Sequence, residues 1–417
     1  MTFKNITCPF CGLACDDLTV SAKQNKLDIL AGQCTLNRAG FNQALWEKTS
    51  TAMMQGKEIA HATAIDKAAS LLKKSEAPLI GGLITDVNGV RTAMALADAC
   101  GAVIDHQDSQ AIFRNTRVLQ DTGWMTTTLT EVRNRADLVI MIGSQVLDDY
   151  PRFFERIIQP KPQFRKKPRQ IILLGSWDGR KIPAELKGDN TTVIKTPMES
   201  VAEVIAALRA TLAERVLDNN QFGGMNSSAI QELAFQLKES QYSVFTWSAK
   251  EFDMPHSELV IEQLVELIKD LNTTTRSSGL PLGGSNGSIS ANQVCTWQSG
   301  IPLRSSFAQG QPQHDALLFD SQRLLKNAEA DLLLWVSSLR SDQPPPDTDI
   351  PTIAIGHPAT QFKRLPEIFI PVGIPGIDHT GHTFRMDGVV TLPLHKLRET
   401  SLLSAADVLS QLTARIS

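Results

Sequence analysis

Four of the six cysteines stand close together at the start of the chain. The segment CPFCGLAC carries Cys8, Cys11 and Cys15, and Cys34 follows further along. Thiolates bind Zn²⁺ and iron–sulfur clusters, and three thiols on one loop with a distant fourth form a ligand pattern of [4Fe–4S] clusters. Structural zinc sites more often use two separated C-x2-C pairs. We therefore expect these residues to hold a [4Fe–4S] cluster, with zinc or a metal-free, packed group of cysteines as the alternatives.

A second set of candidate residues stands where short apolar runs end in glycine or small polar residues. The candidates are Gly143, Ser144, Gly175, Gly283, Gly284 and Asn286. Backbone N–H groups in such turns can bind a phosphate, so these residues are predicted to bind a cofactor. The alternative is that the glycines only serve turn geometry. None of the turns forms a G-x-G-x-x-G or P-loop motif, which argues against an ordinary NAD dehydrogenase or NTPase.

The elements that position these turns follow from the alternation of strand and helix patterns. Buried strands followed by amphipathic helices recur near residues 77–106, 136–158, 169–179, 242–271 and 330–358. Alternation of this kind predicts an α/β protein with doubly wound parallel sheets. In open sheets of this class, ligands bind at the carboxyl ends of the strands, which is where the glycine turns fall.

Composition restricts the class of protein further. The chain has 417 residues, of which 42% are hydrophobic, enough for more than one domain. Its 41 basic and 44 acidic residues give a net charge of -3, which favours neither a nucleic-acid nor an anionic membrane partner. The start MTFKNITC is unlike a secretory signal, and apolar runs such as LVIMIG are too short to cross a bilayer. We expect a cytoplasmic protein with no membrane and no nucleic-acid partner.

Four motifs carry a family resemblance. The stretches CPFCGLACDD, EVRNRADLVIMIG, GSNGSISANQVCTWQSGIP and IPVGIPGIDHTGHTFRMDGV resemble the B subunit of formylmethanofuran dehydrogenase, a branch of the molybdopterin and tungstopterin oxidoreductases. The resemblance implies a small N-terminal iron–sulfur-type domain at residues 1–50 and two doubly wound α/β domains. One would combine 51–135 with 240–417, and the other would be an insertion of residues 136–239. The C-terminal β-barrel of larger superfamily members is expected to be missing.

One segment departs from the pattern of the catalytic family members. Those members carry a cysteine or selenocysteine that ligates tungsten or molybdenum, and the matching segment here, Asp105–Gln120, contains no cysteine. Asp108 or Ser109 could replace that ligand, but the flanking residues AIFRN are not small enough to let a cofactor approach closely. We therefore expect that no tungsto- or molybdopterin is bound and assign no catalytic residue to this chain.

The combination of a retained cysteine motif and a lost metal ligand resembles the B subunit of the formyltransferase/hydrolase complex of methylotrophic bacteria. That resemblance implies a non-redox scaffold in one-carbon metabolism, on the route from formaldehyde to formate. Its partners would be the A, C and D subunits and a methanofuran-type carrier. One alternative is a working tungsto- or molybdopterin formylmethanofuran dehydrogenase subunit. The other is a single-chain protein that carries electrons through the N-terminal cluster.

Two further stretches are expected to have structural roles. The motif GIDHTGHTFRMDG contains histidines and acidic residues that could be mistaken for a metal site, but we expect them to form structural hydrogen bonds on a loop. The basic stretch Lys161–Arg169 is expected to be a solvated surface loop, with contact to an acidic carrier as the alternative.

Overall fold

The computed structural model divides into two compact units. It describes residues 1–23, 25–43, 51–165, 168–177, 179–180, 182–183, 186–217 and 220–416. Unit 1 comprises Met1–Gln110 and Gly284–Ser417, and unit 2 comprises Ala111–Gly283. Unit 2 thus interrupts unit 1 in the sequence.

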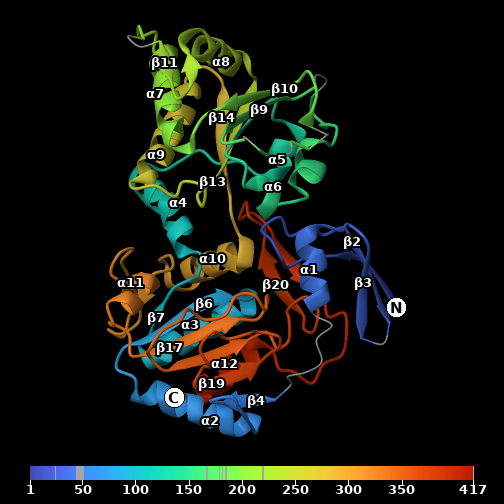
Figure 1. Cartoon of the computed structure of the whole chain (residues 1–417), viewed down its shortest axis with the longest axis vertical. Helices are drawn as coiled ribbons and strands as arrows, with labels where there is room; N and C mark the ends of the chain where they lie inside the picture. The colour runs from blue at the N-terminus through green and yellow to red at the C-terminus, as the bar shows by residue number, and fades with distance from the viewer. Residues whose placement is uncertain are drawn as a thin grey trace. The chain divides into compact units, whose positions relative to one another are not determined.

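The cysteine-rich start of the chain forms a small antiparallel sheet within unit 1 (Figure 1). Its elements are β1 (Thr2–Ile6), β2 (Leu18–Lys23), β3 (Lys26–Ala31) and α1 (Thr35–Gln43). The loop with Cys8, Cys11 and Cys15 connects β1 to β2, and Cys34 lies directly before α1. The sequence spacing therefore places all four thiols on connections between short elements. Part of the expected 1–50 domain, residues 24 and 44–50, lies outside the described residues.

The main sheet of unit 1 has parallel strands at its centre and antiparallel strands at both edges. In spatial order the strands are β16 (Gln313–His314), β15 (Ser305–Ser306), β7 (Val103–Ile104), β6 (Pro78–Ile84), β17 (Leu332–Ser337), β18 (Thr352–Gly356), β19 (Ile368–Pro371), β4 (Ala52–Met54) and β5 (Lys57–Ile59). All residues of β6 and β17 are buried, as expected for central strands covered on both faces.

Helices and a hairpin complete unit 1. They are α2 (His61–Lys74), α3 (Val87–Cys100), α10 (Ser288–Ser299), α11 (Ser321–Lys326), α12 (Ala405–Ile416), the 3₁₀ turn η4 (Ser285–Gly287), and the strands β20 (Gly381–Phe384) and β21 (Thr391–Leu394). The C-terminal helix α12 packs against both α2 and α3. The C-terminal helix therefore packs beside the first two helices that follow strands of the main sheet.

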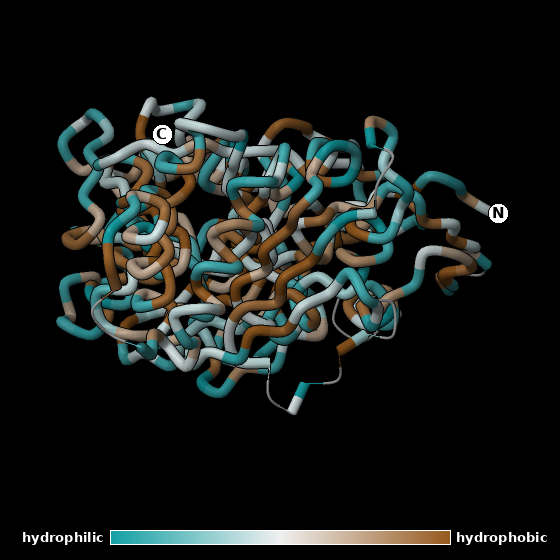
Figure 2. Tube along the Cα trace, turned by 90° about the horizontal axis from the view of Figure 1, so that it is seen from above, coloured by the Kyte–Doolittle hydropathy of each residue, from teal (hydrophilic) through white to brown (hydrophobic). Residues whose placement is uncertain are grey.

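Unit 2 is built on a fully parallel sheet. In spatial order its strands are β10 (Thr191–Lys195), β9 (Gln170–Gly175), β8 (Leu138–Ile142), β13 (Tyr242–Ser248) and β14 (Arg276–Leu282). The remaining elements are α4 (Ser109–Thr122), whose first two residues belong to unit 1, α5 (Leu129–Asn134), α6 (Val146–Asp149), η1 (Phe154–Ile158), η3 (Met198–Ser200), α7 (Val201–Leu212), β11 (Gln221–Phe222), β12 (Met225–Asn226), α8 (Ser227–Glu239) and α9 (Ser257–Leu271). Apolar residues of β8, β13, α7 and α9 form its core. Figure 2 shows long hydrophobic stretches of the trace, in brown, in the middle of the view.

The observed units have different boundaries from the expected domains. Residues 240–283 were expected in the same domain as the C-terminal part, and 136–239 as the insertion. In the structure β13 pairs with β8 and with β14, so these residues complete the sheet of unit 2. Residues 111–135 also belong to unit 2, and residues 1–43 group with unit 1. Pairing between strands that are far apart in sequence decides the boundaries, and hydrophobic periodicity does not report that pairing.

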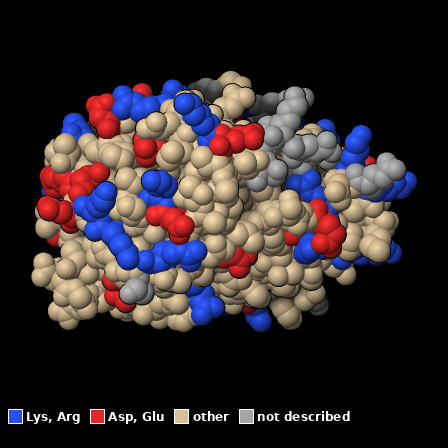
Figure 3. All heavy atoms as spheres, turned by 90° about the horizontal axis from the view of Figure 1, so that it is seen from below, with Lys and Arg blue, Asp and Glu red and all other residues tan. Residues whose placement is uncertain are grey.

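The described residues contain no helix long and apolar enough to cross a membrane. On the face drawn in Figure 3, the described Lys and Arg side chains are interspersed with Asp and Glu. This face therefore shows no large patch of one sign of charge among the described residues.

Candidate functional site

The chain order of the parallel strands creates a switch point in unit 1. After β6 the chain passes to β7 on one side, whereas after β17 it passes to β18 on the other. Ligands of open α/β sheets bind beyond the carboxyl ends of the strands at such a point. Thr85 and Ser338 directly follow β6 and β17, and the Ser338 hydroxyl donates a hydrogen bond of 2.9 Å to the Thr85 Oγ1. The two strand ends are therefore tied together at the base of the switch point.

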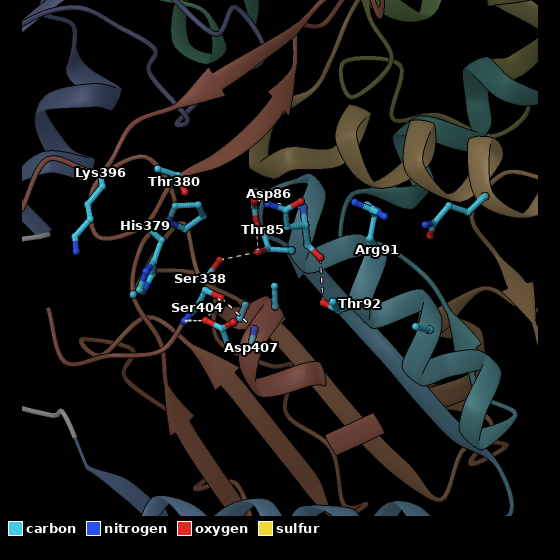
Figure 4. Close-up of a pocket in the computed structure, with 17 residues that line it drawn as sticks. Thr85, Asp86, Arg91, Thr92, Ser338, His379, Thr380, Lys396, Ser404 and Asp407 are labelled. Carbon is cyan, nitrogen blue, oxygen red and sulfur yellow. Dashed lines mark hydrogen bonds between the residues drawn. The ribbon is translucent and has the colours of Figure 1, made fainter. Parts of the chain in front are cut away.

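A cavity of about 650 Å³ opens at this place (Figure 4), and we call it the unit 1 crevice. Arg91 and Thr92 line it from α3, and His379, Thr380 and Lys396 line it from the segments around β20 and β21. Arg91 also lies over the ring of Trp297, at 5.6 Å from its centroid. The lining combines cationic, carboxylate, hydroxyl and amide side chains, so the crevice suits a polar ligand.

The helix N-termini at the unit 1 crevice are capped by the chain's own side chains. The Asp86 carboxylate accepts hydrogen bonds from the backbone N–H groups of Asn88 at 3.3 Å and Gly89 at 3.1 Å. Burial raises the pKa of Asp86, and these backbone hydrogen bonds oppose the rise. At α12, the Asp407 N–H donates to the Ser404 hydroxyl at 3.1 Å. A ligand in this crevice would therefore meet side chains more than free helix amides.

The four N-terminal cysteines lie near one another, three of them on the buried loop between β1 and β2 and Cys34 directly before α1. The Cys8 N–H donates to the Cys15 carbonyl at 2.8 Å, and the Asn37 N–H donates to the Cys34 sulfur at 3.4 Å. Burial, followed by the nearby thiols, raises the pKa of Cys8 well above its usual value. The same causes raise the pKa of Cys11 to about 12. Cys8 and Cys11 therefore lie close enough to the other thiols to be influenced by them, and both favour the protonated form.

This thiol group has the donor atoms of an iron–sulfur site, but its side chains are not arranged around a metal position. Sulfur donors suit an iron–sulfur cluster, and a bound metal would require the thiols to lose their protons. Among the described residues, however, no group of three or more His, Cys, Asp or Glu side chains is placed to hold a metal ion. We therefore derive no chemical step that passes through a metal here.

Three of the sequence motifs meet in unit 1. The Gly12 carbonyl of the cysteine loop accepts a hydrogen bond of 2.7 Å from the Met386 N–H. Gly284 has φ +82°, and a Cβ placed there would lie 3.1 Å from the Gly12 Cα. The predicted glycine turn and the segment with HTGHTFRMDG therefore both pack on the cysteine loop. Gly283, in contrast, closes unit 2, and a Cβ there would meet nothing within 4 Å.

The segment that lacks the metal-ligating cysteine is occupied by internal hydrogen bonds. The Asn286 side-chain amide donates to Asp108 at 3.2 Å. The Ser109 hydroxyl donates to Asp105 at 2.9 Å and accepts from Arg304 Nη2 at 3.0 Å, and Ser109 is 3% exposed. Both residues proposed as replacement ligands thus already have partners within the chain.

A buried ion network surrounds Ser109. Arg304 is 4% exposed and forms ion pairs with Asp320 and, at 3.8 Å, with Asp105. Burial raises the pKa of Asp105 to about 6, against the opposing effect of Arg304 and of hydrogen bonds from Ser321 and Ser109. Sequence reasoning missed Arg304, because only the fold brings it beside a segment 195 residues earlier.

Gly143, Ser144 and Gly175 come together at the switch point of unit 2, which lies between β8 and β13. The Gly143 N–H donates to the Leu174 carbonyl at 2.8 Å, and a Cβ on Gly175 would lie 3.1 Å from the Gly143 nitrogen. The Ser144 N–H donates to the carboxylate of Glu251 at 2.6 Å. Three of the six predicted turn residues therefore meet in unit 2, Gly284 and Asn286 lie in unit 1, and Gly283 joins neither group. Glu251 had escaped the sequence reasoning, although it follows the end of β13 by three residues.

The motif GIDHTGHTFRMDG has the expected structural hydrogen bonds. Asp378 accepts from the Ile374 N–H at 2.8 Å and from Arg398 at 2.6 Å. Arg385 pairs with Asp387 at 2.7 Å. The Nε2 of His379 is buried and has no hydrogen-bond partner among the described residues.

The expectation for the basic stretch Lys161–Arg169 was wrong at its last residue. Arg169 is 5% exposed, and its guanidinium donates to the carbonyls of Val132, Arg133 and Ala136 among others. These carbonyls lie at and just beyond the end of α5, where helix carbonyls lack partners. Residues 166–167 of the stretch lie outside the described residues.

Together, the fold and these sites define a two-unit α/β protein whose N-terminal cysteine loop packs on the Gly284 turn and on the segment around Met386 in unit 1. No family model matches the chain. It is 28% identical to the B subunit of the tungsten-containing formylmethanofuran dehydrogenase 2 of Methanocaldococcus jannaschii, over 93% of this chain and 92% of that protein. It is 29% identical to the B subunit of the formyltransferase/hydrolase complex Fhc of Methylorubrum extorquens, over 75% and 82%.

A solved structure gives the same result. A chain in the crystal structure of the Methylorubrum extorquens formyltransferase/hydrolase complex with methylofuran matches with a TM-score of 0.75 and 27% identity, over 88% of this chain and 98% of that one. The chain is therefore a homologue of the B subunits of formylmethanofuran dehydrogenase and of the formyltransferase/hydrolase complex. The resemblance carried by the sequence motifs is confirmed.

Proposed function

We propose that this chain is the B subunit of a formyltransferase/hydrolase complex in one-carbon metabolism, on the route from formaldehyde to formate. In this role it is a non-redox scaffold in the cytoplasm that assembles with the A, C and D subunits. The complex handles a methanofuran-type carrier. The solved relative supports this assignment, since it belongs to a complex of that kind determined with methylofuran.

The observation that carries the proposal is the state of the segment Asp105–Gln120. It contains no cysteine, and the two residues that could replace that ligand, Asp108 and Ser109, are engaged by Asn286 and by Arg304. A metal ligand must be free to bind the metal in its deprotonated form. Recruiting Ser109 would break its hydrogen bonds to Asp105 and Arg304, whose charges are buried, and this is strongly unfavourable.

The alternative of a working dehydrogenase rests on the two tungsten-containing relatives. The second of them, from Methanococcus maripaludis, is 26% identical over 99% of this chain and 98% of that protein. A dehydrogenase subunit and a formyltransferase/hydrolase subunit would share the same fold, so overall sequence similarity does not distinguish the two functions. The hydrogen bonds of Asp108 and Ser109 do distinguish them, and they favour the non-redox function.

Co-production with candidate A, C and D subunits tests the proposal. We expect the four chains to purify together, to release formate from a formylated carrier, and to contain no stoichiometric tungsten or molybdenum. Stoichiometric tungsten or molybdenum with a pterin, lost in the Ser109→Ala or Asp108→Ala variant, would establish the dehydrogenase alternative instead. A chain that purifies alone and transfers electrons would support the single-chain carrier.

The cysteine loop remains a separate proposal within this function. We propose that Cys8, Cys11, Cys15 and Cys34 hold a [4Fe–4S] cluster that fixes the N-terminal segment. Anaerobic purification is expected to give about four iron atoms per chain and a broad visible absorption, both lost in a Cys11→Ser variant. Stoichiometric zinc, or an absence of metal with an unchanged melting temperature in that variant, would contradict the cluster.

A further inference from the structure

The switch point of unit 2 contains an acidic side chain that none of the sequence motifs includes. β8 leads to β9 on one side and β13 leads to β14 on the other, so the turns after β8 and β13 meet at the place where ligands of such sheets bind. The turn after β8 carries Gly143 and Ser144, and the turn after β13 carries Glu251. Glu251 therefore comes from the strand next to the predicted turn, 107 residues later in the chain.

Glu251 is fitted closely to that turn. Its carboxylate accepts from the Ser144 N–H at 2.6 Å, and the backbone of Gln145 also hydrogen-bonds to it. A Cβ on Gly143 would lie 2.0 Å from the Glu251 Oε2, so a side chain at position 143 and the carboxylate exclude each other. Position 143 therefore requires glycine for two reasons, its φ of +85° and the space that the Glu251 carboxylate occupies.

The turn that holds Glu251 is itself fixed. The next residue, Phe252, is fully buried in the core of unit 2. The Arg114 guanidinium donates to the Ala249 carbonyl at 2.8 Å and pairs with Asp253 at 2.7 Å. These contacts anchor the backbone on both sides of Glu251. The carboxylate itself is held by the hydrogen bonds from Ser144 and Gln145.

A carboxylate in this place changes what the switch point can accept. It takes up backbone N–H groups of the turn and adds a half-buried negative charge. Phosphate or carboxylate groups of a ligand would compete for the same donors and would be repelled by that charge. A neutral group of similar size would not be repelled by the charge and would be hindered only by the space that the carboxylate fills.

We propose that Glu251 closes the switch point of unit 2 to anionic ligands, as a selectivity residue built into the chain. This goes beyond the proposed function, because it concerns which ligands unit 2 excludes and holds whether or not the complex hydrolyses formyl groups.

Alkylation of a single thiol at the switch point tests the proposal. All six natural cysteines belong to unit 1, so Ser144→Cys gives unit 2 one thiol that peptide mass spectrometry can follow. In the full-length chain, the rate with anionic iodoacetate is compared with the rate with neutral iodoacetamide. Glu251→Gln removes the charge and keeps the size of the side chain. Glu239→Gln, an exposed change in the same unit, is the matched control.

We expect Glu251→Gln to raise the ratio of iodoacetate rate to iodoacetamide rate by about tenfold, because one unit charge near the reacting thiol is removed. The Glu239→Gln control should leave that ratio unchanged. Equal acceleration of both reagents, or a ratio no different from the control, would overturn the proposal. Far-UV circular dichroism of each variant establishes that the rates come from folded protein.

Discussion

The two switch points of this chain have the same topology but differ in what lies beyond the strand ends, which is a cavity in unit 1 and a carboxylate in unit 2. In unit 1 the strand ends are tied by Thr85 and Ser338, and a cavity of about 650 Å³ remains beyond them. In unit 2 a carboxylate from the neighbouring turn, that of Glu251, takes up the N–H of Ser144. Topology therefore determines where a ligand could bind, and a few side chains decide whether that place stays available.

The difference extends to how buried charge is balanced. In unit 1, Arg304 pairs with both Asp105 and Asp320, so charges of both signs are buried together. In unit 2, Glu251 is balanced mainly by backbone N–H groups, and burial raises its pKa. Paired charges become very costly when one partner is removed, whereas a carboxylate held by amides can be protonated. The two units should consequently differ in their response to mutation and pH.

Among the changes considered, removal of the Arg304 side chain should have the largest effect on stability. Arg304→Leu leaves Asp105 and Asp320 buried without a counter-charge, and we expect a loss of about 4 kcal/mol in the free energy of unfolding. Urea denaturation gives the magnitude, and hydrogen exchange should show faster exchange in unit 1 with unit 2 unchanged. Arg323→Leu, which removes a more exposed pair with Glu329, should cost about 0.5 kcal/mol. A similar loss in both variants would refute the role given to the buried network.

The pH response should differ in sign between His357 and Glu251. His357 follows β18 in unit 1, and burial lowers its pKa to about 4 from a usual 6.5. The unfolded chain then binds more protons between these values, so the contribution of His357 to stability is lost as pH falls from 6.5 to about 4. Glu251 has a raised pKa, so its contribution is lost as pH rises through that pKa.

His357→Gln isolates the first of these effects, because Asp105 titrates in both proteins. The stability difference between wild type and variant should shrink by about 3 kcal/mol as pH falls from near 7 to 4. Urea midpoints measured across this range give the difference directly. A difference that is independent of pH would mean that His357 is not held neutral by burial.

Much of the architecture could be predicted from the sequence, because it depends on the spacing of residue types along short stretches of the chain. The βαβ alternation, the turns at Gly143 and Gly175, and the hydrogen-bonded character of the motif around Asp378 depend on neighbours in the chain, so spacing reports them. Glu251, Arg304 and Arg169 act on partners that only the fold brings close, and single-sequence patterns carry no signal for them. The unit boundaries differ from the expected domains for the same reason, since the pairing of β8 with β13 is non-local.

The glycine at the unit 2 switch point offers a sharper test of the fit. Gly143→Ala would push a Cβ into the Glu251 carboxylate and would strain a backbone with φ +85°, at an expected cost of about 2 kcal/mol. Adding Glu251→Ala should recover about half of that loss, because the strain remains when the clash is removed. Gly283→Ala, where nothing lies within 4 Å of the new Cβ, should be neutral. Thermal denaturation of the four proteins compares them, and a costly Gly283→Ala would show that the losses are unspecific.

The smallest effect is expected at the rim of the unit 1 crevice. Arg91 is exposed and lies 5.6 Å from the centroid of Trp297, so Arg91→Ala should cost only about 0.5 kcal/mol while changing the Trp297 fluorescence. Lys363→Ala, an exposed change elsewhere in unit 1, should alter neither. A residue that lines a cavity and contributes little to stability can bind a ligand without cost to the fold. Glu251, in contrast, already binds the backbone of its neighbouring turn. A loss at Arg91 as large as that at Gly143 would remove this distinction between the two switch points.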